Sequence, residues 1–199
     1  MVNDDLGAFV DLTGKFGMAS AEFEAQFLVN LLVLNSGIGP TMADTKALFH
    51  ADHSNLAGSG AAPDATTLGA ARLAMRKQTG LSGKPINVTP RYMLVPPELE
   101  TVAEQILATI QPTKSADVNP FGGKLELLVE ARLADTGRWY VVADPAQVEG
   151  LEYAYLQGEE GPQTETRAGF EVDGIEVKVR LDFGAAFMDW RSWYTNEGG

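Results

Sequence analysis

Between residues 175 and 183 apolar and charged side chains alternate without a break, and no other feature constrains the fold as strongly. The apolar members are Ile175, Val177, Val179, Leu181 and Phe183, and the charged members are Glu176, Lys178, Arg180 and Asp182. Successive side chains of a β-strand point to opposite faces, so this pattern predicts one half-buried strand. Asp173-Gly174 precedes it and is a favoured two-residue hairpin turn. We therefore predict a long β-hairpin over 165–183, with a charged face toward solvent or a partner.

Helical periodicity dominates the first third of the chain. Residues 6–34 are predicted to form helix in one or two pieces, with an apolar C-terminal half that indicates burial against other elements. The apolar face of this segment recurs every three or four residues, at Phe23, Phe27, Leu31 and Leu34. Residues 35–65 are predicted to be a long irregular loop. Asp64 is expected to cap a helix over 65–78, which Gly80 would end.

The middle of the chain mixes short apolar runs with one amphipathic helix. Strands are predicted over 91–95, 125–129 and 139–143. The helix is predicted to follow Pro96-Pro97, with an apolar stripe made of Leu99, Val102, Ile106 and Ile110. Helices and strands that do not alternate regularly indicate the α+β class.

The composition excludes several classes of protein. The 199 residues carry a formal net charge of −12, contain no Cys and contain only two His. A free-standing nucleic-acid-binding module needs a basic footprint, so sequence-specific binding to DNA or RNA is not expected. Disulfides, thiolate chemistry and multi-His metal centres are excluded. The longest apolar run, 27–34, falls far short of the ~20 residues that span a bilayer, so no membrane partner is expected.

His50-Ala51-Asp52-His53 is the cluster that most resembles a chemical site. Two imidazoles beside a carboxylate could bind a metal ion or form a general acid–base pair. However, the two His lie three residues apart in a predicted loop, whereas metalloprotease His pairs lie four apart on a helix with a Glu between them. We interpret the cluster as a loop in which the imidazoles and Asp52 bond to nearby backbone groups.

Other candidate motifs are weaker still. Glu159, Glu160 and Glu165 could provide a carboxylate pair, but they lie among turn residues and are interpreted as a solvated acidic loop. Gly58-Ser59-Gly60 lacks the strand–turn–helix context of a nucleophile elbow. We therefore predict no catalytic, cofactor-binding or metal-binding residues, and no cofactor. The aromatic residues are interpreted as core or interface anchors: Trp139, Tyr140, Tyr153, Tyr155, Trp190, Trp193 and Tyr194.

Short segments spread along the chain form an ordered set that covers almost its whole length. They are residues 2–9, 47–57, 90–100, 143–145, 151–156, 169–174, 181–185 and 189–191. In this order they resemble the Mu-like phage major head subunit family, which is similar in fold to the Hong Kong 97-type capsid proteins of tailed phages.

The resemblance implies a fold and a domain organisation. Residues 1–80 would belong to a peripheral domain, 81–163 would form an axial domain of mixed sheet and helices, and 164–199 would return to the peripheral domain with the β-hairpin. Within the first of these the resemblance implies three parts: a long spine helix at about 6–34, a long loop at 35–65 and a helix at 65–78.

The resemblance also implies a structural function. Such a major capsid protein is not an enzyme, binds copies of itself as pentamers and hexamers, and builds an icosahedral shell around DNA. It would contact other head proteins, assemble in the host bacterial cytoplasm and reside in the virion. The alternatives are a capsid-associated prohead protease and a decoration or adaptor protein.

The chain opens at a motif that follows an N-terminal arm and an extended loop in full-length members of that family. We therefore expect a C-terminal portion of the capsid protein, which by itself forms a monomer or small oligomer. If repulsion between copies of net charge −12 limits association, high salt should favour it.

Overall fold

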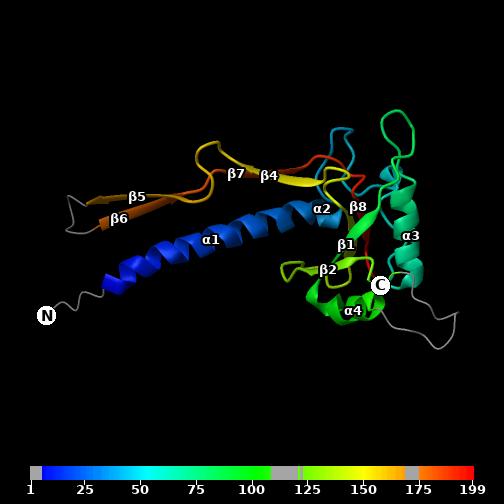
Figure 1. Cartoon of the computed structure of the whole chain (residues 1–199), viewed down its shortest axis with the longest axis horizontal. Coiled ribbons are helices and arrows are strands. Elements are labelled where there is room, and N and C mark those ends of the chain that lie inside the picture. The colour runs from blue at the N-terminus through cyan, green and yellow to red at the C-terminus, as the bar shows by residue number, and fades with distance from the viewer. Residues whose placement is uncertain (1–5, 109–120, 122, 169–174) are drawn as a thin grey trace. The chain divides into compact units, whose positions relative to one another are not determined.

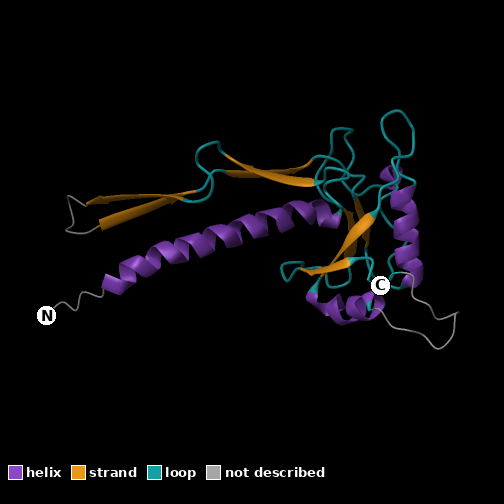
Figure 2. Ribbon diagram, in the orientation of Figure 1, coloured by secondary structure: helices purple, strands orange, loops and turns teal. Residues whose placement is uncertain are grey.

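The computed structural model describes residues 6–108, 121, 123–168 and 175–199 (Figures 1 and 2). The chain divides into unit 1, Met1–Asn30 with Tyr153–Ala186, and unit 2, Leu31–Glu152 with Phe187–Gly199. Its elements, in order, are α1 (Leu6–Leu32), α2 (Leu34–Gly37), η1 (Ala51–His53), α3 (Ala65–Arg76), β1 (Pro90–Val95), η2 (Pro97–Leu99), α4 (Glu100–Leu107), β2 (Glu126–Val129), β3 (Trp139–Ala143), β4 (Leu151–Tyr155), β5 (Gln163–Ala168), β6 (Ile175–Arg180), β7 (Phe183–Phe187) and β8 (Trp193–Asn196). This mixture of helices and strands agrees with the α+β class.

Unit 1 consists mainly of the long helix α1 and strands arranged as narrow two-stranded ribbons. The helix passes through Gly14 and Gly17 without a break. Phe27 of α1 packs edge-on against Phe183 of β7, with ring centroids 5.6 Å apart. The Tyr155 hydroxyl of β4 donates a hydrogen bond of 2.8 Å to the Glu24 carboxylate. These contacts hold the helix against the β4–β7 ribbon.

The predicted hairpin is confirmed as the antiparallel pair β5–β6. Gln163 lies opposite Arg180 and Ala168 opposite Ile175. Within β6, Val177 and Val179 are half-buried while the residues between them are exposed, as the alternation predicts. The expected turn at Asp173-Gly174 lies outside the described residues.

The prediction of one unbroken strand from 175 to 183 is wrong. β6 ends at Arg180, and β7 begins at Phe183 with a different partner, β4. The partner changes because the chain between β4 and β5 turns at Gly158 and Gly161, which have φ of 83° and 78°. These left-handed conformations suit Gly and place β4 and β5 against successive stretches of the returning chain.

Replacing Val179 by Asp should destabilise unit 1. The change places a carboxylate on the half-buried face of β6. Its cross-strand neighbour is Thr164, which offers no positive charge to pair with it. We expect a loss of about 1–3 kcal/mol in the free energy of unfolding, measured by chemical denaturation. Lys178→Ser, on the exposed face of the same strand, is the control and should change stability by less than about 1 kcal/mol. Equal stability of Val179→Asp and the wild type would contradict this placement.

Unit 2 is built on a mixed four-stranded sheet of order β2-β1-β3-β8. β1 pairs parallel to β2, while β3 pairs antiparallel to both β1 and β8. The core on one face joins the sheet to α3 and α4, and its buried members are Leu68, Ala71, Met75, Val88, Met93, Val95, Ala103, Phe121, Trp139, Val141, Ala143 and Tyr194. Tyr140 of β3 points to the opposite face of the sheet. It is buried on that face as well, where its ring centroid lies 5.7 Å from that of Phe49. β3 is therefore the central buried strand.

Most residues predicted to begin or end a helix do so in the structure. α1 gives way to Asn35 and Ser36 in left-handed conformations, and Gly37 follows with φ of 87°. A Cβ on Gly37 would lie 2.8 Å from Arg138 Nε, so the position needs Gly for space as well. Asp64 caps α3 through a hydrogen bond from the Thr67 backbone.

Two helix predictions need correction. Gly80 does not end α3, because the helix already stops at Arg76 and Gly80 instead accepts a hydrogen bond from the Gly83 backbone N–H. In the following helix Leu99 and Ile106 of the predicted stripe pack against the core, but Val102 is 38% exposed and the buried position beside it is Ala103. Ile110 of that stripe lies outside the described residues.

Candidate functional site

Unit 1 has very little core of its own. Val29 is the only buried hydrophobic side chain among the side chains of this unit that the structure describes. Several large apolar side chains are instead exposed, namely Met18 (67%), Phe23 (56%), Tyr153 (60%) and Leu156 (55%). Long helices and two-stranded ribbons gain most of their stability from packing against other elements. The exposed apolar side chains of unit 1 therefore form a candidate surface for association.

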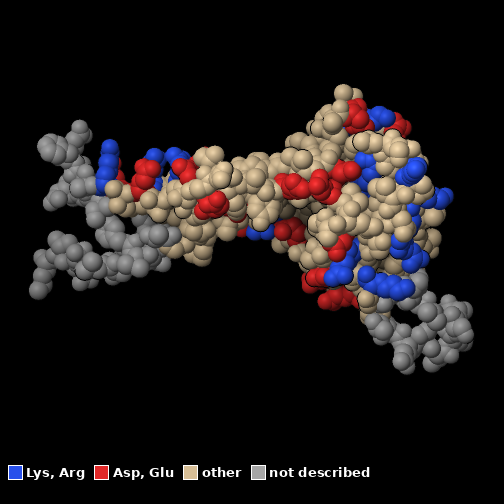
Figure 3. All heavy atoms as spheres, turned by 45° about the horizontal axis from the view of Figure 1, so that its top comes forward, with Lys and Arg blue, Asp and Glu red and all other residues tan. Residues whose placement is uncertain are grey.

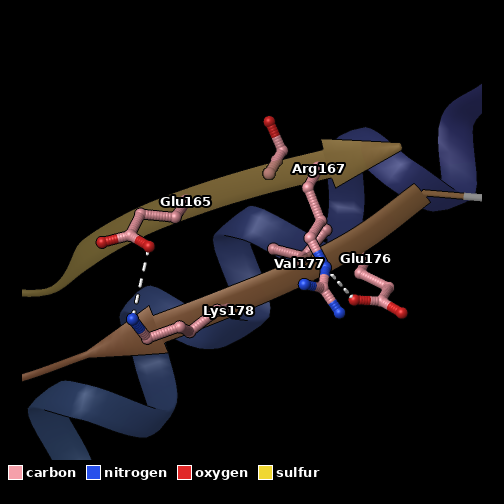
Figure 4. Close-up of a pocket in the computed structure, with 6 residues that line it drawn as sticks. Glu165, Arg167, Glu176, Val177 and Lys178 are labelled. Carbon is pink, nitrogen blue, oxygen red and sulfur yellow. Dashed lines mark hydrogen bonds and ion pairs between the residues drawn. The ribbon is translucent and has the colours of Figure 1, made fainter. Parts of the chain in front are cut away.

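The β5–β6 hairpin carries its charged side chains on one face, and Figure 4 shows two cross-strand pairs of them. On one face cross-strand pairs of opposite charge join Glu165 to Lys178, at 3.3 Å, and Arg167 to Glu176. The same face continues to Arg180, which pairs with Glu159 and Asp182, and the Glu159 carboxylate raises the pKa of the Arg180 guanidinium. Exposed pairs of this kind add little stability but fix strand register.

Glu159, Glu160 and Glu165 each have a partner in the turn or the hairpin. Glu159 and Glu165 are each paired with a cation of the hairpin, and Glu160 accepts a hydrogen bond from the Gly158 backbone N–H. That backbone bond, together with one from its own N–H, lowers the pKa of the Glu160 carboxyl. These carboxylates hold the turn and the ribbon in shape.

The His50–His53 loop is an ordered, hydrogen-bonded structure in unit 2. His53 is buried, and its ring stacks on Trp190 with centroids 4.2 Å apart. Its Nδ1 lies 3.0 Å from the Leu48 carbonyl oxygen and its Nε2 lies 2.7 Å from Asp44 Oδ2. Both ring nitrogens of His53 therefore lie at hydrogen-bonding distance from oxygen atoms of the same loop.

Neighbouring groups in this loop are also paired. The hydrogen bond from His53 holds the pKa of the Asp44 carboxyl below its ordinary value. Lys46 Nζ lies 2.5 Å from Asp52 Oδ2, and this bond lowers the pKa of Asp52 and raises that of Lys46. His50 Nδ1 accepts a bond from the Asp52 backbone N–H at 3.1 Å. These contacts support the interpretation of the cluster as loop architecture.

The sequence reading missed the residue at the centre of this loop. Asn55 is 1% exposed and bonds to Leu48, His50 and the Trp190 carbonyl, so it ties the loop to the C-terminal part of the chain. Asp44 was missed as the partner of His53, nine residues away. Such partners leave no local spacing pattern, although a lone Asn within an apolar loop is a signal of a buried backbone-binding side chain.

The pairing of Asp44 with His53 predicts a pH dependence of stability. Because the folded-state pKa of Asp44 is lowered, its stabilising effect is complete above its unfolded pKa, about 4, and is lost as pH falls through the lower folded value. His53→Phe should flatten the acid side of a plot of Tm against pH, whereas the control Leu81→Ala, at a fully exposed apolar position of the same unit, should leave it unchanged. Identical acid-side slopes in wild type and His53→Phe would contradict the pairing.

The described residues contain no group of three or more His, Cys, Asp or Glu arranged to hold a metal ion. Among them there is also no helix long and apolar enough to cross a membrane. Ser59 lies in irregular chain, and of the predicted aromatic anchors Trp139, Tyr140, Trp193 and Tyr194 are buried in unit 2. The prominent unsatisfied features are therefore surfaces, not pockets.

Comparison with known proteins shows the family to which the chain belongs. A search of curated protein sequences finds no match to this chain. A family model described as phage capsid protein matches residues 1–196. That match spans both units, including unit 1 with its exposed apolar side chains. Phage capsid proteins are structural and assemble into a shell. The chain belongs to the phage capsid protein family.

Proposed function

We propose that this chain is a major capsid subunit of the Mu-like type with a Hong Kong 97-type fold, and that it has no enzymatic activity. The family match over residues 1–196 carries the structural role. The long helix, the β-ribbon and the separate mixed sheet support the finer assignment, because the sequence resemblance implies the same three parts.

The two compact units suggest how the domains divide. We assign unit 1, with α1 and the ribbons, to the peripheral domain, and unit 2, with the four-stranded sheet, to the axial domain. In this assignment residues 31–80 accompany the sheet, although the sequence resemblance grouped them with the spine helix. Much of this segment packs on the sheet, since Leu68, Ala71 and Met75 lie in its core.

Self-association follows from the small core of unit 1. Copies that assemble as pentamers and hexamers would cover Met18, Phe23, Tyr153 and Leu156 and remove their apolar surface from water. The shell so formed encloses DNA, resides in the virion, and assembles in the host cytoplasm together with other head proteins. No residue of the chain needs a cofactor for this role.

Electron microscopy with light scattering tests the proposal. The purified chain is imaged over a concentration series, and small oligomers, up to rings of five or six copies, are expected. A chain that binds only to preformed shells of another protein would instead be a decoration or adaptor protein. A chain that stays monomeric at every concentration would contradict self-assembly, and peptide cleavage by the purified chain would favour the prohead protease.

A further inference from the structure

Five basic side chains of unit 2 have no ion pair with a described carboxylate, namely Arg72, Arg76, Lys77, Lys84 and Lys124. Most Lys and Arg of the described chain are paired, as Arg132 is with Glu130 and Arg191 with Asp189. The exceptions of interest lie on α3 and just before β2, and we call them the basic face: Arg72, Arg76 and Lys124. Figure 3 shows several Lys and Arg side chains gathered on the unit that contains α3. Cations without local partners are available to bind an anion from outside.

The basic face is concave and its arginines are held in place. All three side chains line one hollow of about 310 Å³ together with Phe121. The Arg72 guanidinium carbon lies 4.6 Å from the centre of the Phe121 ring, and Arg76 Nη1 donates a 2.8 Å hydrogen bond to Asn87 Oδ1. Stacking engages the face of a guanidinium and leaves its edge N–H groups free to donate. The two arginines are thus preorganised for a carboxylate or phosphate.

A complementary set of carboxylates lies on another helix of the same unit. We call it the acidic face: Glu98, Glu100 and Glu104, from η2 and α4. All three are exposed, and none is ion-paired with a described Lys or Arg. Glu100 and Glu104 lie four residues apart, as Arg72 and Arg76 do on α3. Residues at this spacing lie on one side of a helix, roughly 5–6 Å apart.

We propose that the basic face of one copy binds the acidic face of a second copy, so that α3 of one lies along α4 of the other. This inference rests on the proposed function, since it names one of the contacts by which copies assemble. The equal spacing lets two Arg meet two Glu at once, and Arg binds carboxylate through two parallel hydrogen bonds. The two faces are different surfaces, so the contact is head-to-tail and can close into a ring.

The partner's chemistry follows from the charge of the chain. A DNA duplex could also supply anions, but its phosphates would be repelled by a protein of net charge −12. The acidic face offers carboxylates at a spacing that fits the arginines, and in an assembly it is present at the same concentration as the basic face. A second copy is therefore the favoured occupant.

Single charge reversals test the contact by sedimentation velocity at low and high salt. Arg76→Glu and Glu104→Lys should each weaken self-association by about tenfold or more. Their controls are Lys84→Glu and Glu149→Lys, which make the same change of net charge at exposed positions of unit 2 outside both faces, and these should associate like the wild type. Association of the wild type should weaken as salt rises, opposite to the effect expected from net repulsion alone.

Mixing the two variants gives the sharper result. Arg76→Glu places like charges at positions 76 and 104, and so does Glu104→Lys, whereas a contact between the two variants restores opposite charges. An equimolar mixture should therefore associate more strongly than either variant alone. No restoration on mixing, or unchanged association of both single variants, would overturn the inference while leaving self-assembly of the wild type intact. A wild-type chain that stays monomeric would contradict the proposed function as well.

Nucleic acid is the competing occupant, and fluorescence anisotropy with a labelled DNA duplex measures it directly. The inference predicts no difference between the wild type and Arg76→Glu in this measurement. Duplex binding by the wild type that Arg76→Glu abolishes, with self-association unchanged, would assign the basic face to DNA and overturn the inference.

Discussion

Trp139→Ala is expected to lower the free energy of unfolding of unit 2 by about 3–5 kcal/mol. Trp139 is 0% exposed on the central strand β3, and its ring fills the space between the sheet and the helices that cover it. Its Nε1 also donates a 2.9 Å hydrogen bond to the Ala61 carbonyl oxygen. Truncation leaves a cavity that the surrounding strands cannot close, because β3 is paired on both sides.

Chemical denaturation followed by far-ultraviolet circular dichroism measures this loss. Leu81→Ala is the matched control, since Leu81 belongs to the same unit but is 99% exposed, and its truncation should change stability by less than about 0.5 kcal/mol. If Trp139→Ala unfolded at the same denaturant concentration as the wild type, β3 could not be the centre of the core.

The parts of the fold that the sequence predicts correctly are those with a local, periodic cause. The alternation of apolar and charged residues predicts the strand that begins at Ile175, helical spacing predicts α1, and Asp64 predicts the start of α3. Each of these signals lies in side chains only a few residues apart. The strand over 139–143 was also predicted with its observed bounds, because an apolar run between turn residues needs no distant information.

The parts that the sequence does not reveal depend on distant partners. β8 was not predicted, although it completes the sheet beside β3, because its four residues mix aromatic and polar side chains without alternation in polarity. Its polar Thr195 is fully buried only because its hydroxyl reaches the Trp139 carbonyl oxygen, 56 positions away in the chain. Likewise, nothing near Phe183 in sequence indicates that its partner is β4 and not β5.

The candidate surfaces show the same division. The charged side of the β5–β6 hairpin was visible in the alternation, and the structure adds only its cross-strand pairs. The basic and acidic faces were not visible, because Arg72 and Lys124 come together only when α3 packs beside the segment that leads into β2. A charge without a local partner becomes apparent only once the contacts of its neighbours are known.

Asn55→Ala is expected to cost about 2–4 kcal/mol, more than its small apolar area would suggest. The Asn55 amide donates to the Leu48 and Trp190 carbonyls at 2.9 and 3.3 Å and accepts from the His50 backbone N–H at 3.1 Å. Truncation leaves the half-buried His50 N–H without this partner, whereas the Leu48 carbonyl retains His53 and the Trp190 carbonyl retains the Trp193 backbone N–H. Asn30→Ala is the control, because Asn30 is exposed on α1, where Ala is the better helix former, and should not destabilise. Since the backbones of Asn55 and Ala57 both pair with Thr195 of β8, the variant should also speed amide exchange at Ala57 and Thr195, whose N–H groups make those bonds. Denaturation and hydrogen exchange that gave the wild-type values for Asn55→Ala would show that this loop is held by the His53–Trp190 stack alone.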